Sequence, residues 1–595
     1  MFTELLASFE AGVTNVSNFL WGGEWNGAQV LPIAPLVILL LGTGLYFMIR
    51  IGFRPLRRLG PAIAEVWAGR KGNGDPSAIT PFQALTTALS GQVGTGNIVG
   101  VATAITLGGP GAVFWMWITA IFGMALAFAE SSLAIKYRER DEFGRLNGGP
   151  MYYITNGLGK HWKWLAILFC IGTIISATAT GGMIQANGMT QNIMAELRPV
   201  SQSLPCIAQQ PTQKNIRQIS TGVQDLEQIT SADLERVSAC QLRSVPQEQL
   251  VLITGEADAE TGIIPVMSAA AVPDIAFQTD LASWILGLVI AVLVFIVIIG
   301  GIKSIGSVAE KLVPAMAVLY VLMCIVVLVL NAHEIPHAFG MIFASAFGLE
   351  QAAGGLAGYA VLSAIRFGVA RGLFSNEAGQ GSAPIAHAAS QMKNPARQGE
   401  IAMIGVFVDT LVICTMTALV IITAEGTFAT SAEFLAKPEM VAAGLTETTT
   451  HLWMAEGANA ATLTNRAFTD ALPGPVGGWI VTLCLTLFAF TTIIGWSYYA
   501  EQAVTFLIGE WATKPFRFIW CGIIFIGAIA QVNIVWMMGD IANASMAIPN
   551  LIAILALSGI VIAIHRANGD PDTADGDSII ALSDKAAAQK NAPAE

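Results

Sequence analysis

Long apolar segments separated by short polar ones run through most of this chain of 595 residues. A membrane-spanning helix needs about 20 mainly apolar residues, and charge-poor segments of at least that length predict about 11 transmembrane helices. They lie near residues 30–50, 83–107, 112–135, 164–196, 281–302, 308–331, 356–390, 400–424, 476–508, 516–539 and 545–565. The pattern therefore predicts an all-α membrane protein rather than a transmembrane barrel, whose strands alternate apolar and polar residues.

The second predicted span is unusual because four glycines lie near its middle: Gly91, Gly94, Gly96 and Gly100. Each glycine costs a helix about 1 kcal/mol relative to alanine. Lipid offers no partners for the backbone groups that a broken helix frees. Close helix packing through a small-xxx-small pair explains only part of this cluster. We therefore expect a broken helix that lines a polar site enclosed by protein.

The seventh predicted span, residues 356–390, is the second irregular one, with several Gly, Pro and charged residues. It lies five spans after the first irregular span and crosses the membrane in the opposite direction. Two interrupted, antiparallel spans five apart are typical of an inverted repeat with a binding site at mid-membrane. The predicted repeats are residues 83–331 and 356–565, a 5+5 pattern with the 30–50 span as an addition.

Basic residues gather on one side of the predicted membrane. Those after the first span are Arg50, Arg54, Arg57, Arg58, Arg70 and Lys71. By the positive-inside rule this side is cytoplasmic. Residues 1–29 are then an external N-terminal segment, and residues 566–595 are a cytoplasmic tail whose composition predicts disorder. The expected location is the cell membrane, or the inner membrane in a Gram-negative bacterium.

Composition supports this assignment, since 54% of residues are hydrophobic and only 12% are charged. The net charge of −11 says little about partners, because a membrane sorts charges by side. We expect no nucleic-acid partner. The longest connection, residues 197–280, is predicted to be an external insert. It contains Cys206 and Cys240, and whether they form a disulfide is left open.

A zinc enzyme and an ion channel are the other functions considered. His333, Glu334 and His337 match the spacing of zinc proteases. However, Pro336 stands where that helix must continue, and the segment falls in a predicted outer loop. A channel needs a continuous polar pore, whereas two broken helices favour an enclosed site. We expect neither bound zinc nor enzymatic activity.

Three sequences resemble the alanine or glycine:cation symporter family: SGQVGTGNI at residues 90–98, GPGAVFWMW at 109–117 and GLFSNEAGQGSAP at 372–384. The resemblance implies a leucine-transporter-type fold. It also implies sodium-coupled uptake of a small neutral amino acid, alanine or glycine, by alternating access and without a cofactor. A proton-coupled carrier and a channel stay as alternatives. The expected partners are the amino acid, sodium ion and lipid bilayer, and the oligomeric state is left open.

The break in the second span is the predicted substrate site. The half-helix after it presents N–H groups and the positive end of its dipole, which suit a carboxylate. The predicted substrate-binding residues are Thr95, Gly96 and Asn97 for the carboxylate, with Gly94 at the same break, Gln185 and Asn187 for the amino group, Phe367 as a cap over a small side chain and Trp496 as a pocket wall.

Sodium is predicted to bind beside the same break. Carbonyl groups near Ser90 and Val93, at the end of the first half-helix, are hard oxygen ligands suited to a small cation. The fold that the resemblance implies adds the hydroxyls of Thr491 and Thr492. Asp409 is a further intramembrane charge that needs a partner. We expect Arg366 or Arg371 to pair with it, in preference to direct ion coupling.

Overall fold

The computed structural model describes most of the chain. The described residues are 2–567 without 27, 32–33, 73–77, 143, 198–250, 254–265, 269–280, 350–353, 430–446, 452–459, 473–474 and 531–532. Cys206 and Cys240, and with them the question of a disulfide, lie outside the described residues.

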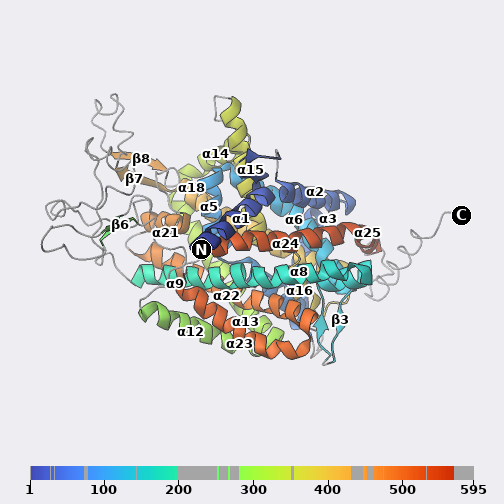
Figure 1. The fold of residues 1–595 in the computed structure, drawn as a ribbon. Helices are drawn as coiled ribbons and strands as arrows, with labels where there is room; N and C mark the ends of the chain where they lie inside the picture. The colour runs from blue at the N-terminus through green and yellow to red at the C-terminus, as the bar shows by residue number, and fades with distance from the viewer. Residues whose placement is uncertain are drawn as a thin grey trace.

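Helices dominate the described part of the chain (Figure 1). The first half contains α1 (Phe2–Gly22), α2 (Pro35–Arg50), α3 (Arg54–Ala68), α4 (Pro81–Gln92), α5 (Val99–Gly108), α6 (Gly111–Lys136), α7 (Pro150–Tyr152), α8 (Lys163–Ser176), α9 (Ile184–Leu197), α12 (Leu281–Ile298) and α13 (Gly301–Leu330). The second half contains α14 (Ile335–Ala346), α15 (Gly354–Asn376), α16 (Ala383–Ala388), α17 (Pro395–Val406), α18 (Thr415–Thr423), α21 (Ala460–Ala471), α22 (Val476–Ile508), α23 (Thr513–Ile529), α24 (Asn533–Ala556) and α25 (Ser558–Ala567).

Shorter elements join these helices. The 3₁₀ turns are η1 (Gly69–Lys71), η2 (Thr95–Asn97), η4 (Lys160–Trp162), η10 (Ala332–Glu334) and η13 (Glu510–Ala512), and the π-helical segments are η3 (Tyr153–Leu158), η5 (Ala177–Met183) and η11 (Phe407–Cys414). Four antiparallel hairpins pair β1 (Glu24–Trp25) with β2 (Ala28–Gln29), β3 (Glu139–Arg140) with β4 (Leu146–Asn147), β5 (Val251–Ile253) with β6 (Val266–Ser268), and β7 (Glu425–Ala429) with β8 (Glu447–His451).

In the part of the chain that the structure describes, seven helices are long and apolar enough to cross a membrane. The number rises to nine if each of two bent pairs counts as one crossing: α2 with α3, bent by 76°, and the later part of α24 with α25, bent by 61°. The two predicted spans without such a helix are the two that were expected to be broken. The fold class, an all-α membrane protein, is confirmed.

Some boundaries differ from the prediction. The predicted span 516–539 ends as a helix at Ile529, and the residues from Asn533 onward belong to α24. Hydropathy cannot locate the boundary between α23 and α24 because the residues around it are themselves apolar. The predicted loop 332–355 contains α14, which packs against α6, and the loop 425–475 contains α21, which packs against α5 and α22.

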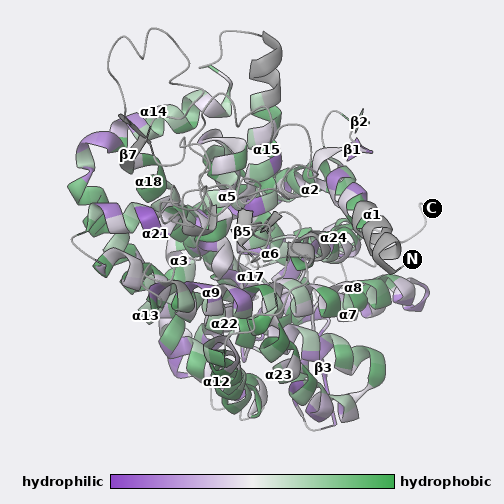
Figure 2. Cartoon of the chain, turned by 60° about the vertical axis from the view of Figure 1, so that its left-hand side comes forward, coloured by the Kyte–Doolittle hydropathy of each residue, from purple (hydrophilic) through white to green (hydrophobic). Residues whose placement is uncertain are grey.

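The outer helices present apolar side chains where lipid would lie. Figure 2 shows hydrophobic residues along α12 and α23, which pack against each other. Leu288, Ile296 and Phe518 on these helices are each more than half exposed. Large exposed apolar surfaces are rare on soluble monomers, and they suit a protein whose solvent is a bilayer.

The two broken spans run antiparallel, as predicted. Ile79, just before α4, forms a parallel bridge with Ser390, just after α16. Further along, α5 packs against α15. The start of one broken span therefore lies beside the end of the other. Thr80 caps α4 in a capping box with Gln83, and the proline at the first turn fixes where this helix begins.

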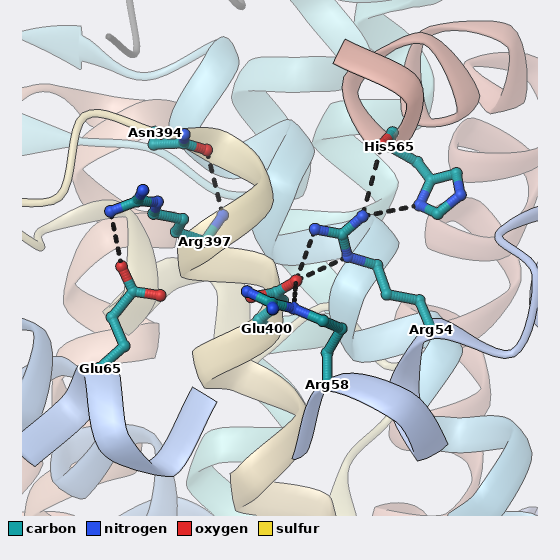
Figure 3. Close-up of polar contacts among 7 residues, drawn as sticks. All are labelled: Arg54, Arg58, Glu65, Asn394, Arg397, Glu400 and His565. Atoms are coloured by element: carbon teal, nitrogen blue, oxygen red, sulfur yellow. Dashed lines mark hydrogen bonds and ion pairs between the residues drawn. The ribbon is translucent and has the colours of Figure 1, made fainter. Parts of the chain in front are cut away.

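A buried carboxylate joins three elements at this same end of the molecule (Figure 3). Glu400 on α17 is fully buried and accepts hydrogen bonds from Arg54 Nε at 2.7 Å and Arg58 Nε at 3.0 Å, both on α3. Arg54 also reaches the ring of His565 on α25, at 3.0 Å. This network ties the amphipathic helix α3 to the start of the eighth span and to the last helix.

Replacing Glu400 by alanine should destabilise the protein strongly, because Arg54 would stay buried without its carboxylate. Breaking a buried ion pair by removing one partner costs about 3–5 kcal/mol. The control is Glu65→Ala, because Glu65 pairs with Arg397, whose side chain is 45% exposed. Exposed pairs contribute about 0–1 kcal/mol. Thermal unfolding in detergent should show a much larger loss for Glu400→Ala, and equal shifts would contradict this assignment.

Candidate substrate and cation site

The second span is broken where the glycines predicted it. Helix α4 ends at Gln92, Val93 and Gly94 are extended, and η2 leads into α5. The freed backbone groups find partners within the protein, as they must in a membrane. Asn97 Oδ1 accepts the Gly94 N–H at 2.9 Å, and Gln185 Oε1 accepts the Thr95 N–H at 3.1 Å.

The ninth span closes on this break. Thr492 Oγ1 on α22 lies 3.2 Å from the carbonyl oxygen of Val93 and 3.0 Å from that of Phe488 in its own helix. A Cβ atom on Gly94 would lie only 2.5 Å from the same hydroxyl oxygen. Since Gly94 has a φ of −139°, which any residue adopts, a glycine is required here for space. The break thus places one carbonyl and one hydroxyl oxygen side by side.

The seventh span breaks between α15 and α16. Glu377 adopts a φ of +57°, which is uncommon for a residue with a side chain, and Gly379 and Gly381 also have positive φ. Ser382, just before α16, donates its Oγ hydrogen to Glu377 Oε2 at 2.6 Å. The irregular segment expected from the sequence is therefore a tight turn that carries a buried carboxylate.

Asp409, on the π-helical segment η11, links the two breaks. Its Oδ1 accepts Asn97 Nδ2 from the first break at 2.6 Å. Its Oδ2 accepts Ser375 Oγ, next to the second break, at 2.7 Å, and also Thr410 Oγ1 at 2.8 Å. Asp409 is fully buried. Both broken spans are thereby fastened to the eighth span.

The expectation that Arg366 or Arg371 pairs with Asp409 is wrong. Arg366 forms an ion pair with Glu24 at 3.0 Å, and the Arg371 guanidinium lies over the Phe374 ring. Neutral donors satisfy the Asp409 oxygens instead. Sequence spacing could not distinguish these partners, because Glu24 comes from a segment outside the predicted spans.

A small cavity lies between the breaks. Five of the predicted site residues line it: Gly94, Gly96, Gln185, Thr492 and Trp496. Trp496 donates its indole hydrogen to the Gly91 carbonyl at 3.3 Å. Val93, Thr95 and Asn97 belong to the same break without lining the cavity.

Four further predicted residues do not line this cavity. Asn187 donates to the carbonyl of Ala530 at 2.5 Å, at the end of α23. Thr491 Oγ1 turns to Phe488 O and Met316 Sδ. Phe367 is half-buried near Gly108, at the far end of α5, and Ser90 Oγ donates back to Thr87 O.

The sequence missed several residues that line the cavity. They include Gln92, Thr180, Phe374, Glu377, Gln380 and Asn543. Phe374 lies two helical turns after Phe367. The prediction of a phenylalanine at the pocket therefore names the right type of residue at the wrong depth in the span. Glu377 and Gln380 could have been found, because both stand in the irregular segment that was expected to line the site.

The histidine motif lies away from this cavity. His333 lies in the short turn η10, whereas His337 lies on α14, and both are exposed. Both rings lie near Glu334, at 3.5 and 3.3 Å. Within the described residues, no group of three or more His, Cys, Asp or Glu is arranged to hold a metal.

A helical membrane protein with a small polar cavity between two broken, antiparallel spans is built as a secondary transporter. Its sequence says which kind. The model of the sodium:alanine symporter family matches residues 16–207 and 258–574, and the chain belongs to that family. It is therefore a cation-coupled amino-acid symporter of a multi-pass membrane type, and not an enzyme. The unmatched residues 208–257 fall within the predicted insert.

Individual relatives agree on the class and differ in substrate. The sodium/alanine symporter AgcS of Methanococcus maripaludis is 36% identical over 94% of this chain and 97% of its own length. The "Probable sodium/glutamine symporter GlnT" of Bacillus subtilis is 31% identical over 89% of this chain and 88% of its own. Among solved structures, MhsT in complex with L-phenylalanine matches with a TM-score of 0.45 at 13% identity, covering 86% and 96% of the two chains.

Gly94→Ala should abolish most transport, because its Cβ would push the Thr492 hydroxyl away from Val93. The matched control is Gly100→Ala, whose Cβ would find its nearest neighbour 4.0 Å away and would favour the helix by about 1 kcal/mol. Amino-acid uptake in proteoliposomes, normalised to the amount of folded protein, should fall at least about tenfold in the first variant only, the equivalent of 1.4 kcal/mol. Normal uptake by Gly94→Ala would contradict the claim that a glycine is required for space next to Thr492.

Proposed function

We propose that this protein imports a small neutral amino acid, alanine or glycine, by sodium-coupled symport with alternating access. The observation that carries the proposal is the cavity between the two broken spans, with backbone groups of both polarities at its edge. N–H groups suit the carboxylate of an amino acid, and carbonyl oxygens suit sodium. Both components would bind within a few residues of each other.

The N–H groups of Thr95 and Gly96 are the proposed carboxylate binders, with Asn97 as their support. In the present conformation Gln185 Oε1 accepts the Thr95 N–H. A substrate carboxylate would take over that hydrogen bond and release the Gln185 side chain. The positive end of the helix dipole at η2 and α5 favours this exchange, because a carboxylate carries a full negative charge.

The walls of the cavity favour a small side chain. A Cβ on Gly96 would lie 2.8 Å from the Phe374 ring, and one on Gly181 would lie 2.4 Å from Trp496. Phe374 and Trp496, which both line the cavity, therefore pack directly on glycine backbone and limit the space in it. This closeness supports alanine or glycine over a longer substrate such as glutamine.

The proposed sodium ligands are the carbonyl of Val93 and the hydroxyl of Thr492, which are already in contact. Thr492 is preferred to Thr491, because both hydroxyls lie near the Phe488 carbonyl but only that of Thr492 also reaches the Val93 carbonyl at the break. Asp409 supports a second possibility, proton or sodium coupling at its carboxylate, because it is fully buried and linked to both breaks.

Thr492→Ala should raise the sodium concentration for half-maximal uptake, because it removes one oxygen ligand in a site with little water. A loss of about 1.4 kcal/mol corresponds to a tenfold shift. Thr491→Ala, the neighbouring hydroxyl on the same helix, should shift it less than about twofold. Uptake at graded sodium concentrations tests both variants. If neither variant shifts the sodium dependence, the cation site lies elsewhere, and uptake driven by a pH gradient would point to Asp409.

We also propose that the N-terminus is outside and the C-terminal tail cytoplasmic, on the basis of the Lys and Arg distribution. The basic helix α3 and the start of α17 lie together at one end, where Glu400 joins them. That end would then face the cytoplasm.

Single cysteines introduced by Gly69→Cys and Ser220→Cys into a variant without other reactive thiols test this orientation. An impermeant thiol reagent applied to intact cells should label position 220 and leave position 69 unlabelled until the membrane is opened. The reverse result would invert the topology.

A further inference from the structure

Three acidic side chains are buried in the described part of the membrane region without a basic partner: Glu130, Glu377 and Asp409. Burying a carboxylate away from water is costly unless it is paired or well hydrogen-bonded. All three accept hydrogen bonds, and Glu377 accepts one from Ser382. Asp409 accepts three hydrogen bonds, and Glu130 accepts one from Asn550, which also binds the carbonyl of Gly379.

Glu377 differs from the other two because it lines the cavity between the breaks. Its side chain is held there by a backbone conformation, φ +57°, that a residue with a Cβ rarely adopts. Ser382 donates to one carboxylate oxygen and the Trp496 side chain also lies within hydrogen-bonding reach, but among the described residues no Lys, Arg or His forms an ion pair with Glu377. Only 1% of the residue is exposed.

Gln380 lines the same cavity three residues later, in the same turn. Its side-chain carbonyl oxygen is buried and has no hydrogen-bond donor in the described structure. Leaving a buried acceptor unsatisfied costs about 1–3 kcal/mol. The second break thus offers the cavity a negative charge and an unused acceptor, whereas the first break offers N–H groups.

We propose that Glu377, assisted by the side-chain oxygen of Gln380, binds the ammonium group of the substrate. This inference rests on the proposed function and makes it more specific. An ammonium group supplies three N–H donors and a positive charge, and Glu377 has no cationic partner of its own among the described residues. Charge-assisted hydrogen bonds of this kind are about twice as strong as neutral ones. The first break then binds the carboxylate of a zwitterion and the second break binds its ammonium group, so acids without an amino group bind more weakly.

The test compares L-alanine with propionate, which has the same carbon skeleton and carboxylate and no amino group. Apparent affinities of the purified protein in sodium buffer are obtained from ligand-dependent increases in melting temperature. Glu377→Gln keeps the size and removes the charge. It should weaken L-alanine at least about tenfold, as expected for a hydrogen bond to a charged group, and leave propionate within twofold.

Two further variants separate binding from folding. Ser382→Ala removes the hydrogen bond within the turn, so any effect should be equal for both ligands. Gln380→Met removes the second acceptor at similar length and should weaken L-alanine alone, which keeps the test decisive if Glu377→Gln does not fold.

Three results would overturn the inference. Equal weakening of both ligands, with a raised sodium requirement, would make Glu377 a cation ligand. Unchanged L-alanine affinity would exclude a direct contact. If the wild-type protein binds no amino acid with any sodium dependence, the proposed function fails first, and its failure is seen without any variant.

Discussion

Backbone groups cannot remain unpaired inside a membrane, and this constraint explains most of the arrangement around the two breaks. Each break frees N–H and carbonyl groups where no water or lipid can satisfy them. The protein supplies amide and hydroxyl side chains instead: Asn97 and Gln185 take N–H groups of the first break, and Thr492 takes a carbonyl. These polar side chains therefore compensate for the backbone hydrogen bonds that the broken helices lose.

The eighth span acts as the fixed support for this arrangement. At one end Glu400 is held by two arginines of α3. Nine residues later Asp409 is bonded to both breaks. Around Asp409 the helix changes to the π-helical segment η11, a form that frequently occurs at functional sites. Movement of either broken span relative to the eighth span would change the hydrogen bonds to Asp409, so a transport cycle has to keep or exchange these bonds.

The sequence allowed the fold class, both breaks, their antiparallel relation and about half of the site to be predicted. Glycine clusters and charge-poor lengths depend on local physics, so they can be read directly. The depth and direction of a side chain depend on packing, which sequence does not show. For this reason the sequence predicts Phe367 as a pocket residue although Phe374 lines the cavity, and it cannot tell which of Thr491 and Thr492 faces the break. The Asp409 partners were missed because neutral donors carry no charge pattern.

The position of the proposed ligands suggests how sodium and substrate would be coupled. The Val93 carbonyl and the Thr95 N–H lie two residues apart in one short break, where Thr492 and Gln185 contact them. Sodium at Val93 would fix the backbone of the break, so the substrate would then lose less conformational entropy on binding beside it. By linkage, the substrate must increase sodium affinity by the same factor. Coupling in this scheme needs no long-range signal, because one rigid turn of backbone serves both ligands.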